Sequence, residues 1–185
     1  MADVVVDTEH CNNLEKHREW GRYWEEQFCK LAAKYGKSFT ANQIGQTSSA
    51  RAFFHNGRRF SWHVLPDITL WTAPGEHHEI KHKNPTWRGE FGLEDYRLEA
   101  LLWFAGETGQ SVYYTIHNHD LAGGRDVRIN DIAHWVTVNV LELDGTWIRS
   151  DVGDTYYNGG QGRKVRLYWD IRLWRPLESI WTPVE

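Results

Sequence analysis

The stretch from residue 66 to residue 81 constrains the fold most strongly, because two strand-like segments flank a turn there. β-branched and aromatic residues dominate positions 60–71, and Pro74-Gly75 has the composition of a tight turn. Residues 78–83 can then run back beside the first segment. The sequence therefore predicts a β-hairpin with its turn near position 74.

Three charged side chains are expected to converge on this hairpin. With the turn near position 74, Asp67 and Glu79 fall at corresponding heights, and Glu79 and Lys81 project from the same face. Two adjacent carboxylates repel each other unless a divalent cation neutralises them, and such oxygen ligands suit Mg²⁺ or Mn²⁺ better than zinc. A lysine beside them can hold a phosphate oxygen or orient a metal-activated water. The pattern indicates a metal site of the kind that phosphodiester hydrolysis requires.

The order of these residues, Pro66-Asp67, then a hairpin's length, then Glu79-x-Lys81, resembles the motif of the PD-(D/E)XK nuclease superfamily. The resemblance implies a restriction-endonuclease-like α/β fold, with an αβββαβ core and a mixed central sheet over about residues 14–120. It also implies a Mg²⁺ ion, for which Mn²⁺ could substitute, bound by Asp67, Glu79 and the backbone carbonyl of Ile80. Asp67, Glu79 and Lys81 would be the catalytic residues of a nuclease that hydrolyses DNA phosphodiester bonds.

A helix is predicted before the hairpin, over residues 14–35, and it offers a further metal ligand. Its large apolar residues recur at helical spacing, and Gly36 follows as a C-terminal cap would. Glu25 borders the apolar stripe, whereas Glu26 points well away from it. Because an early helix often supplies an extra acidic ligand in the nuclease superfamily, the resemblance makes Glu25 a candidate ligand. A solvated glutamate on the helix face is the alternative.

The same letters also allow a zinc site. The segment His78-Glu79-Ile80-Lys81-His82 matches the H-E-x-x-H pattern of zinc metallopeptidases, in which two histidines four apart on a helix bind the metal. That interpretation needs a buried helix, yet the segment has one strongly apolar residue, Ile80, and is bounded by Pro74-Gly75 and Pro85. Glu99 and Glu107 are available as a third ligand. A catalytically silent nucleic-acid-binding module is a third class that stays open.

Basic and aromatic residues outside the hairpin are candidate contacts to nucleic acid. Trp87 and Arg88 lie in a predicted loop after Lys81, where the arginine could bind a phosphate and the tryptophan a base or sugar. Arg58 follows Asn56-Gly57, a strong hairpin-turn signal. Arg166 and Arg172 lie on the basic face of a strand predicted over residues 164–174. Ordinary solvated surface is the alternative for all of them.

The remaining elements are expected from local patterns. A helix over residues 93–108 and a strand over residues 111–117 would complete the core. Because this helix often lends a polar residue to the site in the nuclease superfamily, the resemblance makes Tyr96, Arg97 or Glu99 candidates, although none lies in a motif. A β-rich extension is predicted over residues 121–185. It would hold a strand at 135–143, a hairpin turn at Asp144-Gly145, a return strand at 146–149 and a mobile loop at 151–162.

Length and composition limit the remaining possibilities. The 185 residues suffice for one domain, 1–185, and a net charge of −4 gives no global attraction to nucleic acid, so any such contact must be local. Cys11 and Cys29 provide no disulfide framework, and no stretch approaches the length of a membrane span. We therefore expect a cytoplasmic protein with no membrane partner. Cutting both strands of DNA would favour a homodimer.

Overall fold

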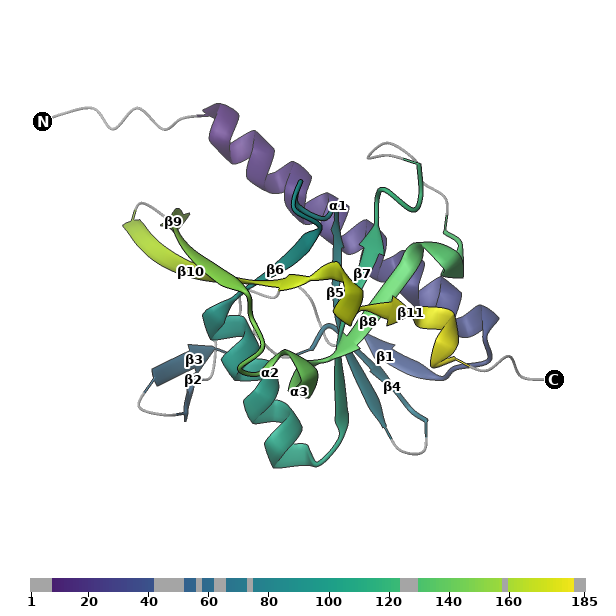
Figure 1. The fold of residues 1–185 in the computed structure, drawn as a ribbon. Helices are drawn as coiled ribbons and strands as arrows, with labels where there is room; N and C mark the ends of the chain where they lie inside the picture. Colours follow the sequence, from purple (N-terminus) through teal and green to yellow (C-terminus); the bar gives the residue numbers. More distant parts are fainter. Residues whose placement is uncertain are drawn as a thin grey trace, which may run out of the picture.

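The chain forms a mixed α/β fold around a central sheet in the computed structural model (Figure 1). The structure describes residues 8–41, 52–55, 58–61, 66–72, 75–123, 130–157 and 160–181. Within these residues the central sheet has six strands in the order β1-β4-β5-β7-β8-β11. Their bounds are Phe39–Ala41, Ile68–Leu70, Glu76–Lys83, Ser111–Asn118, Trp135–Asn139 and Arg175–Pro176. The β5–β7 pair is parallel and the other pairs are antiparallel, so the mixed sheet that the sequence predicts is confirmed.

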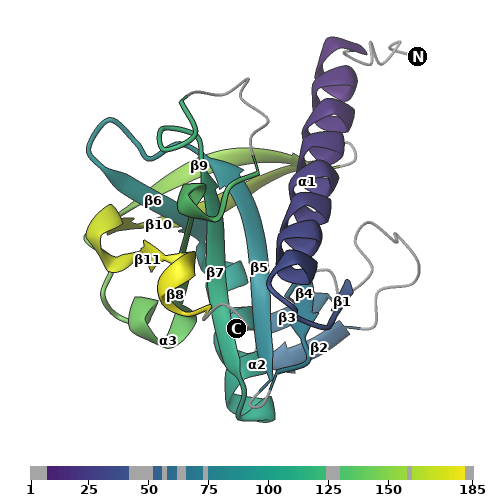
Figure 2. The ribbon, with the colours of Figure 1, turned by 90° about the vertical axis from the view of Figure 1, so that its right-hand side faces the viewer.

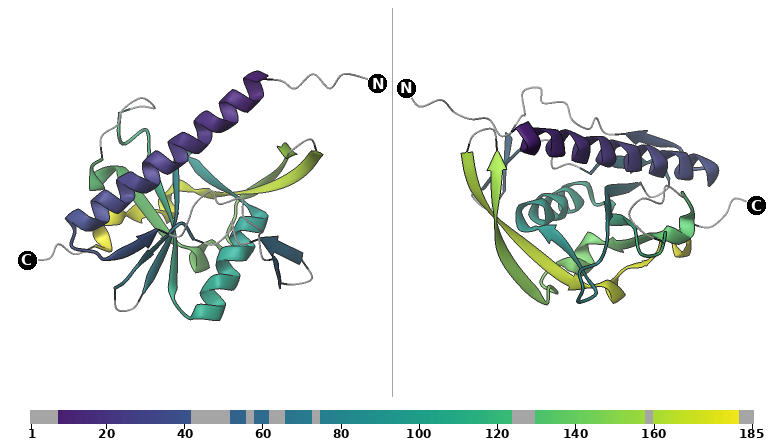
Figure 3. Two further views of the ribbon diagram at one scale, coloured as in Figure 1. Left: turned by 180° about the vertical axis from the view of Figure 1, so that it is seen from behind. Right: turned by 90° about the horizontal axis from the view of Figure 1, so that it is seen from above.

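Two helices cover opposite faces of this sheet (Figures 2 and 3). Helix α1 (Thr8–Lys34) packs Trp24 and Phe28 against one face, in a cluster that includes Ile80 of β5. Helix α2 (Asp95–Thr108) packs Leu98 and Leu101 against the other face. Because side chains alternate along a strand, β5 can bury Ile80 under α1 while it turns Glu79 and Lys81 to the other side.

A second sheet lies beside the first on the α2 side. It contains β6 (Glu90–Glu94), β10 (Gly160–Asp170) and β9 (Arg149–Tyr157), in that order. Strands β9 and β10 form a long curved hairpin that extends away from the central sheet (Figure 1). Short helices complete the described elements: α3 (Val140–Leu143), η2 (Ile132–His134), η3 (Ile171–Leu173) and η4 (Leu177–Ser179).

The structure confirms the two long helices but corrects the strands predicted between the first helix and Asp67. Strands β2 (Ala52–His55) and β3 (Arg58–Ser61) form the hairpin expected around Asn56-Gly57, but they make a separate two-stranded sheet. The outer neighbour of β4 in the central sheet is instead β1. The single strand predicted over residues 60–71 is also wrong, because β3 and β4 are separate strands of different sheets.

The predictions for the C-terminal third are wrong at several places. The segment expected as a mobile loop, 151–162, lies mostly in the β9–β10 hairpin, and the strand expected over 135–143 ends at Asn139. The side chain of Asn139 accepts a hydrogen bond from the N–H of Leu141 and so begins α3. No hairpin turns at Asp144-Gly145, since β8 pairs with β7 and β11 whereas β9 pairs with β10. Among the described helices, none is long and apolar enough to cross a lipid bilayer.

Candidate active site

The β4–β5 pair brings the predicted acidic residues together. Ile68 pairs with His78 in the antiparallel register, so Asp67, one residue earlier, lies level with Glu79. The backbone N–H of Ile80 donates a hydrogen bond of 2.7 Å to Asp67 Oδ2. This bond fixes the Asp67 carboxylate at the point where β4 begins. The turn residues 73 and 74 lie outside the described part of the chain.

Glu79 is fully buried and is neutralised by two cations. Lys81 Nζ lies 2.6 Å from Glu79 Oε1, and Arg97 Nη1 of helix α2 donates to the same oxygen. Lys81 Nζ also donates to the Ile80 carbonyl oxygen over 2.9 Å and lies 3.6 Å from Asp67 Oδ2. Asp67, Glu79 and Lys81 therefore meet at one point of the molecule, and Arg97 joins them from a different element.

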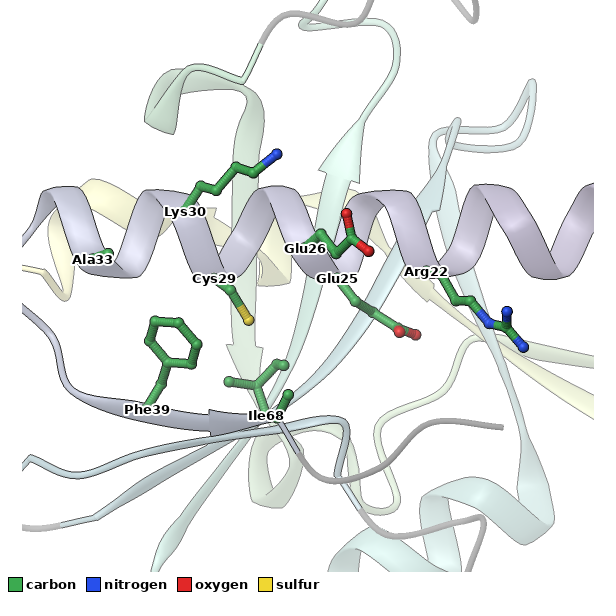
Figure 4. Close-up of a pocket in the computed structure, with 9 residues that line it drawn as sticks. Arg22, Glu25, Glu26, Cys29, Lys30, Ala33, Phe39 and Ile68 are labelled. Atoms are coloured by element: carbon green, nitrogen blue, oxygen red, sulfur yellow. The ribbon is translucent and has the colours of Figure 1, made fainter. Parts of the chain in front are cut away.

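Helix α1 adds a third carboxylate to this region. Glu25 is buried and close enough to Asp67 and Glu79 for both to raise its pKa, whereas Glu26 is exposed. Glu25 also lines a cavity of about 470 Å³ between α1 and the strands β1 and β4. Figure 4 shows Glu25 directed away from α1. Further along the same helix, Cys29 points toward Ile68, and Phe39 lies on that side of α1 as well. The helix-wheel argument thus selected the glutamate that the fold turns inward.

Burial and mutual repulsion shape the ionisation of the three acids. Desolvation, followed by the charge of Asp67, raises the pKa of Glu25 to about 7. Desolvation and the charge of Glu79 raise the pKa of Asp67 to about 6. Burial would also raise the pKa of Glu79, but Arg97 and Lys81 outweigh it and lower that pKa below its ordinary value. The site thus holds one firmly ionised carboxylate and two that release their protons near neutral pH.

Two carboxylate oxygens in the site are buried with no hydrogen-bond partner, Glu79 Oε2 and Glu25 Oε2. An unpaired buried carboxylate oxygen is costly, and a divalent cation with oxygen ligands would satisfy it. Across the described residues, no three or more His, Cys, Asp or Glu side chains form a complete metal cage.

The zinc interpretation of residues 78–82 is wrong. These residues lie in strand β5, where a separation of four positions corresponds to about 13 Å, so the two imidazoles cannot share a metal ion. His78 is fully buried and bonded through Nδ1 to Thr115 Oγ1 at 2.8 Å. His82 packs against Trp24, at 4.2 Å between ring centroids, and its Nδ1 lies 3.0 Å from His117 Nδ1. Both histidines belong to the packing under α1.

The candidate nucleic-acid contacts have different surroundings. Trp87 is 89% exposed, and the guanidinium of Arg88 lies 4.7 Å from the centroid of its ring. Arg166 lies on β10, 3.5 Å from Glu94. The strand predicted over 164–174 ends at Asp170, so Arg172 lies in η3, 2.6 Å from Asp170, and both arginines have a carboxylate partner. The side chain of Arg58 lies outside the described part of the chain.

The segment expected as a flexible loop after Lys81 contains strand β6, which pairs with β10. Its Gly92 carbonyl accepts a hydrogen bond of 2.6 Å from Lys83 Nζ, and burial lowers the pKa of this lysine to about 7. Sequence reasoning missed Lys83, although its position two residues after Lys81 placed it on the same face of the strand. Arg97 was named only as one of three polar residues on its helix. No local signal selected it, because its contact with Glu79 depends on how α2 packs on the sheet.

The comparisons with known proteins define the class of fold. This chain has the restriction-endonuclease-like fold: a mixed α/β structure with a mixed central sheet. Among solved structures it is similar to Hjc, a Holliday junction resolvase from the archaeal hyperthermophile Archaeoglobus fulgidus. The identity is 14%, the TM-score is 0.53, and the match covers 88% of this chain and 100% of the other. No family model matches the sequence, and no curated protein matches it.

Proposed function

We propose that this chain is a metal-dependent nuclease that hydrolyses phosphodiester bonds in DNA. The observation that carries the proposal is the meeting of Asp67, Glu79 and Lys81 at one point, beside a buried carboxylate oxygen with no partner. A nuclease explains why a third buried acid, Glu25, lies beside the two that Lys81 and Arg97 already neutralise, since a bound cation would offset its charge. The likeness to a Holliday junction resolvase supports the proposal and makes branched DNA the first substrate to test.

The residues present fit a Mg²⁺ or Mn²⁺ ion. Asp67, Glu79 and the Ile80 carbonyl would hold it, with Glu25 as a further carboxylate from α1. All of these ligands are oxygen atoms, the type that these ions prefer. When bound, such an ion neutralises charge on the phosphate and lowers the pKa of water.

Lys81 would supply the positive charge that orients the attacking water. The Lys81 side chain is 31% exposed, which leaves it accessible to substrate, and Asp67 and Glu79 outweigh burial to raise its pKa. A lysine that stays protonated can orient a water molecule and stabilise negative charge on the phosphorane, but it cannot remove the proton. Arg88 and the exposed ring of Trp87 would bind the DNA backbone and a base or sugar further from the site.

Incubation with DNA tests this proposal. The protein is mixed with supercoiled plasmid, single-stranded circles and a four-way junction, each with Mg²⁺, Mn²⁺ or EDTA. We expect metal-dependent cleavage that falls by about 100-fold or more in Lys81→Ala, because a charge at the reaction centre is lost. Lys34→Ala, at an exposed lysine near the end of α1, is the matched control and should cleave like wild type. Full cleavage by Lys81→Ala, or none by wild type with any metal, would refute the proposal.

A further inference from the structure

The contacts of Arg97 suggest a role in metal loading. Lys81 and Arg97 both bind Oε1 of Glu79, so the two carboxylates Asp67 and Glu79 face two cations. Glu79 is fully buried, and the side chain of Arg97 is 16% exposed. The two cations therefore balance the charges of Asp67 and Glu79 before any metal binds, and Glu25 is the further acid of the site.

A divalent cation would disturb this balance. It adds two positive charges next to a guanidinium in surroundings that screen charge poorly, which disfavours binding. The cost falls if an anion arrives together with the metal. A DNA phosphodiester is such an anion, and a guanidinium pairs well with phosphate oxygens because its donors form a planar fork.

Arg97 is better placed than Lys81 to exchange its partner. Lys81 also donates to the Ile80 carbonyl on its own strand and lies near Asp67, which ties it to β5. The hydrogen bond that the structure gives Arg97 goes to Glu79 from a separate helix, and its Nε is buried without a hydrogen-bond partner. The Nε–H of the guanidinium is therefore a donor that could bind a phosphate oxygen.

We propose that Arg97 is an exchangeable counter-ion of Glu79 that turns to a substrate phosphate when the metal binds. Metal and DNA would then bind cooperatively, and metal-free protein would hold the ion weakly. This inference rests on the proposed nuclease function and adds to it the order in which the site fills.

The test measures the coupling between metal and DNA directly. Ca²⁺ serves as the probe because it takes the same oxygen ligands. Calorimetry gives its affinity for the full chain alone and with a short-armed four-way DNA junction, and electrophoresis verifies that the DNA stays intact. We expect DNA to tighten Ca²⁺ binding by about 10-fold or more, and Ca²⁺ to tighten DNA binding by the same factor, because thermodynamic coupling is reciprocal.

Variants at Arg97 separate the counter-ion from a structural role. Arg97→Met should bind Ca²⁺ about 5-fold or more tighter than wild type without DNA, and its coupling to DNA should shrink correspondingly. Arg97→Gln also removes the charge but keeps an N–H donor for Glu79, so it should show the same tighter Ca²⁺ binding and reduced coupling, which covers the case in which Arg97→Met does not fold. Arg175→Met is the matched control, because it removes an exposed arginine paired with Glu142 at 2.8 Å, and it should behave like wild type.

The outcomes distinguish the two proposals. Unchanged or weaker Ca²⁺ binding by Arg97→Met, while wild type binds Ca²⁺, overturns the counter-ion and leaves the nuclease standing. Wild type that binds neither Ca²⁺ nor Mn²⁺, with or without DNA, overturns both.

Discussion

Asp67 is the residue at which stability and the proposed activity oppose each other. Its pKa is raised from 3.8 to about 6, first by burial and then by Glu79. A carboxyl group whose folded-state pKa exceeds its unfolded value destabilises the folded chain when it ionises. The penalty is absent below the unfolded pKa, grows as pH rises, and is complete above the folded pKa of about 6.

Asp67→Asn should therefore stabilise the metal-free protein at high pH. The amide keeps an oxygen for the Ile80 N–H but carries no charge. We expect the free energy of unfolding in EDTA to rise by about 1 to 3 kcal/mol at pH 8 and the gain to disappear toward pH 4. Urea unfolding at both pH values measures it, and metal-dependent cleavage should be lost. A variant less stable than wild type at pH 8 contradicts this view of the site.

The pH dependence of metal binding can show whether Glu25, and not Glu26, is a metal ligand. A carboxylate must lose its proton to bind a metal, so Mn²⁺ affinity of the wild type should rise between pH 6 and pH 8, across the pKa of about 7 for Glu25. Glu25→Gln should weaken Mn²⁺ binding and flatten the part of this rise above pH 7. Glu26→Gln, at an exposed position, should keep both. Mn²⁺ titrations at a series of pH values give the answer, and equal behaviour of the two variants would exclude Glu25 as a ligand.

The sequence carries enough information to place Asp67, Glu79 and Lys81, because a hairpin with a period of two relates their positions directly. It cannot place Arg97 in the same way. This arginine reaches Glu79 from a helix 18 positions further along the chain, and its contact depends on how α2 packs on the sheet. Local patterns can find the residues of one hairpin, but not a partner that tertiary packing supplies.

At the scale of elements, the errors occur where a strand's partner is distant in sequence. Strands β6 and β10 pair across Glu94 and Arg166, 72 positions apart, and β6 has only two apolar residues around Gly92, too short a pattern to indicate a strand. Gly145 has φ of 67°, so the turn chemistry of Asp144-Gly145 is real, but it follows α3 instead of joining two paired strands. The long helices are confirmed because their periodicity is local.

The contact between β6 and β10 can be tested at Gly92. A Cβ at this position would lie 2.9 Å from both Arg166 Cδ and Tyr168 Cε1, and the buried tyrosine ring has little room to move. We expect Gly92→Ala to destabilise the protein by about 1 to 3 kcal/mol, because it overpacks the interface. The Gly92 carbonyl also binds Lys83 and Tyr114, so a shift there would reach the neighbourhood of the site.

Gly106 provides a control of opposite sign. It lies in α2 with no heavy atom within 4 Å of an added Cβ, so Gly106→Ala should stabilise the protein by up to about 1 kcal/mol. Urea unfolding of both variants makes the comparison. Gly92→Ala as stable as wild type would show that β6 and β10 separate more easily than the register suggests.

At the scale of the whole molecule, the site joins the two layers that cover the sheet. Glu25 comes from α1 on one face, and Arg97 comes from α2 on the other. Asp67, just before β4, and Glu79 on β5 lie between them. The geometry of the site therefore depends on both apolar clusters, and a change in either helix would alter charges at the same point.

The net charge of −4 makes DNA binding a matter of local cations, and this can be measured from its salt dependence. Each cation that neutralises a phosphate of duplex DNA contributes about 0.9 to the slope of log affinity against log salt concentration. Arg88, beside the exposed ring of Trp87, should contribute, so Arg88→Ala should reduce the slope by about 1. Arg172 is held by both oxygens of Asp170, at 2.9 and 2.6 Å, so Arg172→Ala should leave the slope unchanged. Fluorescence anisotropy with labelled DNA in EDTA gives both slopes. The opposite ranking would mean that DNA lies along β10 and its following turn, and that the Asp170 pair opens on binding.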